Sequence, residues 1–257
     1  MRGMPMLPYP IHIIYRDYMA GVLRGDLGNL GRVPLLDALI MFLPNTLILA
    51  FGGIVVATVF GIVLGIIAAI KQNKLADNII MGLSLLTSSI PVFFLAVLLM
   101  LIFSLHLGWL PSRGMAGWQG MILPIATLGL PSIGFIARTT RTAMLDIRGA
   151  EYIKAARARG ISERNIIFNH TLKNMSVPII TAVALRLSEL LAGTFLVELA
   201  FSVPGVGRVL LDAITNRSPA PMIGGILALW LSFTLINLAA DLLCAAVDPK
   251  TSKGILD

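Results

Sequence analysis

The stretch ALIMFLPNTLILAFGGIVVATVFGIVLGIIAAI, from Ala38 to Ile70, contains no charged residue. The hydrocarbon core of a bilayer is about 30 Å thick, and a helix crosses it with about 20 apolar residues. Within that core only a helix or a closed barrel satisfies its own backbone hydrogen bonds. The stretch is long enough to cross, and it therefore predicts a membrane-spanning helix.

Four further apolar runs follow along the chain: Ile79 to Leu107, Met121 to Ala137, Val177 to Val197 and Met222 to Val247. The 257 residues are 57% hydrophobic and 13% charged, and their mean hydropathy is +0.88. This composition excludes an ordinary soluble domain. The sequence predicts an all-α polytopic membrane protein, with five membrane helices in a transmembrane domain of residues 38–247.

The positive charges follow a pattern along the chain, whose net charge is +7. Twelve cations fall in alternate loops and the tail: Lys71, Lys74, Arg138, Arg141, Arg148, Lys154, Arg157, Arg159, Arg164, Lys173, Lys250 and Lys253. The two remaining loops hold three. The positive-inside rule then predicts that loop 138–176 and tail 248–257 are cytoplasmic, and that loop 198–221 and segment 1–37 are external.

The predicted topology leaves segment 1–37 outside without a preceding helix to carry it there. We expect either that a first membrane helix is missing or that this segment crosses unaided. The cations of loop 138–176 are explained by retention in the cytoplasm. Aromatic residues for base stacking are nearly absent from the loop, so a nucleic-acid partner is not expected.

Small residues recur every four positions in the first run, at Gly53, Ala57, Gly61, Gly65 and Ala69. This spacing lines one helix face and predicts that another helix packs closely against it.

Ionisable residues inside membrane helices are costly and commonly functional. Arg186 and Glu189 stand three residues apart, on one face of the fourth predicted helix. The pair either lines a wet cavity or clamps two helices, and the spacing leaves both open. No enzyme is expected, because the histidines His12, His106 and His170 are scattered and no H-E-x-x-H or G-x-S-x-G motif occurs. No metal site is predicted either.

Loop 138–176 contains a short amphipathic helix that Gly160 should end. Ser162 is placed to cap a second helix, which runs to Pro178 at the start of the next span. A loop that only retained cations would not need this helix, glycine corner and helix. The first helix carries small alanines that the groove of another protein could accept.

The run EYIKAARARGISERNIIFNHTLKNMSVPII, residues 151–180, resembles the cytoplasmic signature loop of permeases of binding-protein-dependent ABC importers, in the dipeptide, oligopeptide and nickel branch. It departs from the general family pattern at Lys154, where an acid is usual, and in the closing residues 170–173. Three more stretches resemble the same branch: RGDLGN at 24–29, VELAFSVPGVGRVLLDAI at 197–214 and NLAADLLCAAVDPK at 237–250. Ser218 departs again, where the branch often has an acid.

The resemblance implies a type I ABC importer permease fold in the cell inner membrane. It also implies that the family's first membrane helix is missing from this chain. It also implies four kinds of partner: the lipid bilayer, a second homologous permease, two cytoplasmic ATPases and an extracytoplasmic substrate-binding protein. This chain has no G-x-x-x-x-G-K-[ST] phosphate loop. ATP and Mg²⁺ are therefore expected on the partner ATPase, and no cofactor is expected in this chain.

The resemblance also assigns residues. The expected ATPase-coupling residues are Glu151, Tyr152, Ala155, Ala156, Arg157, Arg159 and Gly160. Pro204, Gly205 and Gly207 are expected in an external loop near the binding protein, with a plain connecting turn as the alternative. Arg186, Glu189 and Glu198 are the candidates for the wall of the translocation path.

The expected function is ATP-driven import, by alternating access, of di- or oligopeptides, nickel or a metal chelate. The sequence does not decide among these cargoes. A non-transporting membrane scaffold or signalling protein, which binds cytoplasmic partners through loop 138–176, is the alternative.

Overall fold

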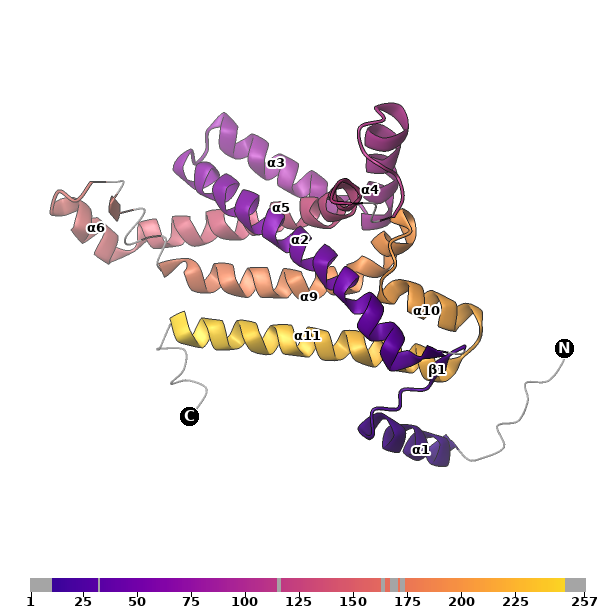
Figure 1. Ribbon diagram of the computed structural model, residues 1–257. Helices are drawn as coiled ribbons and strands as arrows, with labels where there is room; N and C mark the ends of the chain where they lie inside the picture. Colours follow the sequence, from indigo (N-terminus) through magenta and orange to yellow (C-terminus); the bar gives the residue numbers. More distant parts are fainter. Residues whose placement is uncertain are drawn as a thin grey trace.

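The computed structural model describes residues 11–31, 33–114, 117–162, 165–166, 171 and 174–247. Four long helices form a bundle: α2 (Leu35–Ile70), α5 (Gln119–Gly149), α9 (Ser176–Phe201) and α11 (Pro219–Val247). Each contains a segment long and apolar enough to cross a membrane. Figure 1 shows them running along one another, with α6 (Glu151–Ala158) beyond one end of the bundle and α10 (Val206–Thr215) at the other.

A fifth apolar segment is broken by a bend of 103° between helix α3 (Leu75–Ser89) and the run Val92–His106. That run consists of α4 (Val92–Leu99) and the π-helix η1 (Met100–His106). The break falls where Ile90 takes an extended conformation before Pro91, as a residue preceding proline prefers. The predicted all-α membrane fold is confirmed, but its second span is a bent pair and not one straight helix.

The face of α2 that carries small residues every four positions packs against another helix, as predicted, and that helix is α5. A Cβ atom added at Gly61 would lie 2.8 Å from Ile136 Cβ, and one at Gly65 would lie 2.6 Å from the Ala137 carbonyl oxygen. The two backbones approach too closely at these positions for a larger residue. Glycine is therefore what allows the central helix pair to form.

Helix α3 is joined to α5 by polar contacts near the α6 end of the bundle. Arg141 donates two hydrogen bonds to the buried Asp77 carboxylate, Nε to Oδ1 at 2.6 Å and Nη2 to Oδ2 at 2.7 Å. The backbone N–H of Asn73 donates to Asp77 Oδ2 at 2.9 Å. Arg138 Nη1 donates to the Ser84 carbonyl oxygen at 2.7 Å.

The N-terminal segment lies at the α10 end. It contains α1 (Ile11–Leu23) and a two-residue hairpin of β1 (Asn29–Leu30) and β2 (Val33–Pro34). The Tyr18 hydroxyl donates to the Ala220 carbonyl oxygen at 3.2 Å, and burial raises the pKa of this phenol above its usual value. Segment 11–37 and loop 198–221, both predicted external, thus share one end of the molecule.

Candidate functional site

The predicted coupling helix is α6, which follows α5 after a break at Ala150, where the backbone is extended. Its anchor is Ile153, which is buried with Ile166. Glu151, Tyr152, Ala155, Arg159 and Gly160 are exposed. The side chain of Ala156 lies outside the described part. Most of the predicted coupling residues are therefore accessible, and Ile153, an apolar residue of the predicted amphipathic helix, is the buried one.

The glycine corner predicted after this helix is present. Gly160 has φ +76°, in the left-handed region, and its N–H donates to the Arg157 carbonyl oxygen at 2.9 Å. An added Cβ atom would meet nothing within 4 Å, so glycine is needed here for its backbone conformation and not for space. Ser162 Oγ accepts the Asn165 N–H at 3.4 Å, as its predicted capping role requires, and most of the predicted second helix lies outside the described residues.

Hydrogen bonds of two α6 residues, Tyr152 and Arg157, connect this helix to its neighbours. Tyr152 Oη accepts a hydrogen bond from Asn174 Nδ2 at 3.2 Å, just before α9. The guanidinium of Arg157 donates to the Arg148 carbonyl oxygen at 3.4 Å, and Arg148 in turn donates to the Ala69 carbonyl oxygen, at the end of α2, at 3.3 Å. Movement of α6 would therefore act on the ends of α2, α5 and α9 together.

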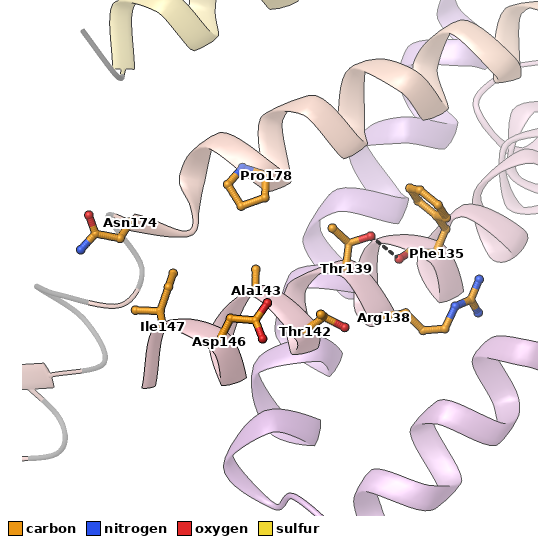
Figure 2. Close-up of a pocket in the computed structure, with 9 residues that line it drawn as sticks. All are labelled: Phe135, Arg138, Thr139, Thr142, Ala143, Asp146, Ile147, Asn174 and Pro178. Atoms are coloured by element: carbon orange, nitrogen blue, oxygen red, sulfur yellow. Dashed lines mark hydrogen bonds between the residues drawn. The ribbon is translucent and has the colours of Figure 1, made fainter. Parts of the chain in front are cut away.

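A cavity of about 580 Å³ opens beside these contacts, between α5 and the start of α9. Its lining, drawn in Figure 2, comprises Phe135, Arg138, Thr139, Thr142, Ala143, Asp146, Ile147, Asn174 and Pro178. Seven of these residues come from α5 alone. Sequence analysis missed the cavity, although the spacing of Arg138, Thr142 and Asp146 along one helical face is a signal that could have found it.

Arg186 and Glu189 form an ion pair with each other within α9. The Arg186 guanidinium also lies over the Phe135 ring, 4.0 Å from its centroid, so it connects α9 to α5. Its Nε is buried without a hydrogen-bond partner among the described residues. The pair thus has the contacts of a clamp, and it stands directly behind Phe135, a residue of the cavity wall.

Glu198 is buried, with 1% of its surface exposed, and organises the loop before α10. Its carboxylate accepts a hydrogen bond from Thr46 Oγ1 at 2.6 Å and another from the Gly207 N–H at 2.7 Å. Thr46 Oγ1 accepts the Val206 N–H at 2.9 Å. A Cβ atom at Gly205 would overlap the Glu198 carboxylate, so the glycine is required for contact.

These positions separate the three residues expected to line one path. Glu198 lies with Gly205 and Gly207, as part of the loop framework, whereas Arg186 is twelve residues earlier in the same helix, about 18 Å away by helical rise. Pro204 accepts a hydrogen bond at its carbonyl oxygen from Asn45 Nδ2 at 2.7 Å. Within the described residues, no three His, Cys, Asp or Glu side chains come together to hold a metal ion.

Comparison with known proteins gives a family match. Residues 61–253 match the model of the family described as "Binding-protein-dependent transport system inner membrane component". The chain is 39% identical over 246 residues to the glutathione transport system permease protein GsiC of Salmonella choleraesuis (strain SC-B67), covering 95% of this chain and 80% of the relative. It is 37% identical over 245 residues, with the same coverage, to GsiC of Escherichia coli (strain K12).

Two solved structures have a similar fold. A chain of the inward-facing MetNI methionine ABC transporter superposes with a TM-score of 0.68 and 21% identity, over 82% of this chain and 96% of that one. A chain of an amino acid ABC transporter crystallised with histidines gives a TM-score of 0.61 and 16% identity, over 90% of this chain and 98% of that one.

Proposed function

Because this chain belongs to the binding-protein-dependent transport system inner membrane component family, and is thus a multi-pass permease subunit of an ABC importer, we propose that its cargo is a short peptide. It moves the peptide by alternating access, as one of two homologous permeases. Two cytoplasmic ATPases bind ATP and Mg²⁺ and supply the energy, and an extracytoplasmic binding protein delivers the cargo. This chain contributes no cofactor and no hydrolytic group.

The peptide cargo is supported by the relatives named for glutathione, which is itself a tripeptide. The similarity to these relatives extends over nearly the whole chain, including the α5–α9 cavity. A cavity of this volume is within the usual range for small-ligand sites, about 300–1,000 Å³.

The observation that carries the coupling mechanism is the position of α6. It lies beyond the membrane helices, exposes small and polar side chains, and is tied to three long helices by Tyr152, Arg157 and Arg148. A partner ATPase that binds the exposed face of α6 and then moves would transmit its movement to the helix bundle through these hydrogen bonds. In this assignment the α6 end and the C-terminus face the cytoplasm, and the α10 end faces outward.

The test is to co-express the chain with candidate ATPase and second-permease chains and to measure co-purification, ATP hydrolysis and peptide uptake. Gly160→Pro removes the N–H bond to Arg157 and forbids φ +76°, so ATPase binding or coupled uptake should fall at least tenfold. Ala155→Trp adds bulk on the exposed face and should act in the same way.

Gly149→Ala is the matched control, because an added Cβ atom there meets nothing within 4 Å and no positive φ is required. It should leave complex formation and uptake unchanged. Wild-type coupling in both Gly160→Pro and Ala155→Trp would overturn the assignment of α6 as the ATPase contact. Stable ATPase binding by a wild-type complex that imports no peptide would instead favour a non-transporting scaffold.

A further inference from the structure

The α5–α9 cavity has charges of opposite sign at its two ends. Arg138 and Asp146 both line it, separated by eight residues of α5, or two helical turns. Figure 2 shows them toward opposite ends of the row of lining side chains, with Thr142 and Ala143 between. The rise of a helix puts their backbones about 12 Å apart.

Arg138 retains unused hydrogen-bonding capacity. Its guanidinium donates to two neutral acceptors on α3, the Ser84 carbonyl oxygen at 2.7 Å and Ser88 Oγ at 3.2 Å. A guanidinium has five N–H donors, so three remain. Within the described residues no carboxylate pairs with Arg138, whereas the neighbouring Arg141 and Arg186 each have one. A positive charge on a membrane helix without a counter-ion favours a carboxylate ligand.

Asp146 supplies the complementary charge at the other end. It is exposed to the cavity side, and no hydrogen bond or ion pair to it is found in the part of the chain that is described. Its nearest basic neighbour in sequence, Arg148, is directed to the Ala69 carbonyl oxygen. A carboxylate in this position is an acceptor for an ammonium group.

We propose that this cavity binds a peptide of about three residues by both of its charged ends, with the α-carboxylate at Arg138 and the α-ammonium at Asp146. An extended chain covers about 3.3–3.6 Å per residue, so three residues reach about 10–11 Å. This length is close to the roughly 12 Å that the helical rise puts between the backbones of Arg138 and Asp146. This inference rests on the proposed import function and specifies the cargo by its free ends.

The cavity wall between Arg138 and Asp146 is mostly apolar, so it would accept peptides with different side chains. Phe135, Ala143, Ile147 and Pro178 are apolar and give no directional contact, while the Thr139 hydroxyl donates its hydrogen to the Phe135 carbonyl oxygen at 3.1 Å. Thr142 and Asn174 are the other polar residues of the lining, and the charged groups it offers are those of Arg138 and Asp146. The charge-assisted contacts would therefore go to the two ends of the peptide. The ammonium end would lie nearer α6, so the peptide would travel with its amino end first.

The test is equilibrium binding of radiolabelled trialanine to the assembled importer in lipid nanodiscs, without the binding protein, because that protein could itself select for free ends. Unlabelled trialanine, N-acetyl-trialanine and trialanine amide are the competitors. With the wild-type complex, each blocked peptide should compete at least tenfold more weakly than trialanine.

Two variants assign the two ends. In Asp146→Asn, N-acetyl-trialanine should compete as well as trialanine, while the amide stays weak. In Arg138→Gln the amide should compete as well as trialanine, while the acetylated peptide stays weak. Asp212→Asn is the matched control, since Asp212 is half-exposed on α10 beside Arg208 and should keep the wild-type pattern.

Arg138→Gln removes hydrogen bonds to α3 and could disturb that helix. Asp146 is exposed, so Asp146→Asn should leave the fold intact and tests the proposal by itself. Equal competition by all three peptides in the wild type, absence of peptide binding, or an Asp146→Asn complex that still prefers a free amino end would overturn the proposal. Failure of the import function gives a different result: the complete wild-type system, with its binding protein, would show no ATP-driven trialanine uptake. Uptake that persists without end selectivity in the cavity would reject only this inference.

Discussion

The buried carboxylate of Glu198 leaves no room for a side chain at two positions, Gly205 before α10 and Gly207 within it. The Glu198 side chain occupies the space in which a Cβ of Gly205 would stand, and Glu198 Oε2 lies 2.7 Å from the place of a Cβ at Gly207. A short, tight loop at this end of the molecule therefore depends on a glutamate in the preceding membrane helix.

Gly205→Ala should destabilise the protein by about 1–3 kcal/mol, the usual cost of forcing an extra methyl group into a packed site. Thermal unfolding in detergent would measure the change. Gly82→Ala in α3 is the matched control, because a Cβ atom there meets nothing within 4 Å and alanine favours the helix. A melting temperature that falls equally in both variants would contradict the contact with Glu198.

Thr46→Val should also destabilise the loop, by about 1–3 kcal/mol, because it removes the hydroxyl that donates to Glu198 and accepts from Val206, and leaves both groups buried. Thr234→Val serves as control, since that hydroxyl is exposed and bonds only to the Trp230 carbonyl oxygen. Limited proteolysis of 202–206 would detect the loosened loop; unchanged cleavage would argue against Thr46 as its support.

At the scale of elements, α3 is held to α5 by the Asp77–Arg141 pair, in which Asp77 is almost fully enclosed. The pair holds α3, the first half of the bent segment, against α5. An ion pair so placed stabilises little by itself, but the loss of Arg141 would leave the Asp77 carboxylate buried without a counter-ion.

Arg141→Ala should therefore cost about 3–5 kcal/mol of stability, and the double variant with Asp77→Ala should cost less than the sum of the two single changes. The comparison is Asp212→Ala, which breaks an exposed pair with Arg208 at 3.6 Å and should change stability by less than about 1 kcal/mol. Denaturant titration of both series would check this, and strict additivity for Asp77 and Arg141 would exclude their coupling.

On the scale of the whole molecule, α6 lies at one end of the bundle, and α1, the hairpin and α10 lie at the other. The four long helices between them are candidate membrane spans, and the bent pair of α3 with Val92–His106 is a fifth. The proposed orientation in the membrane is based on the cations at the end of α5 and in or just after α6, among them Arg141, Arg148, Lys154, Arg157 and Arg159.

Single cysteines introduced in a Cys244→Ala background would check this orientation with a membrane-impermeant maleimide on intact cells or right-side-out vesicles. Asn216→Cys, exposed after α10, should react at once, whereas Lys154→Cys, exposed on α6, should react only after permeabilisation. The opposite labelling pattern would show that the proposed orientation is wrong, because α6, the proposed ATPase contact, would then face the outside of the cell.

Local sequence alone predicted the all-α membrane class, the apolar segments, the face of small residues on α2 that packs closely against another helix, and the corner at Gly160. These properties follow from local composition and spacing: the bilayer requires long apolar helices, small residues in register allow close approach, and a left-handed corner favours glycine. The predicted helix after Ser162 remains a prediction, because its residues are mostly outside the described part.

Which polar groups meet is visible only in the folded molecule. Glu198 bonds to Thr46 across 152 positions and Arg141 to Asp77 across 64, and the α5 face bearing Arg138 and Asp146 becomes a cavity only because α9 starts beside it. Helix crossings and loop paths set these outcomes, because they depend on packing between distant segments, which periodicity along the chain does not encode.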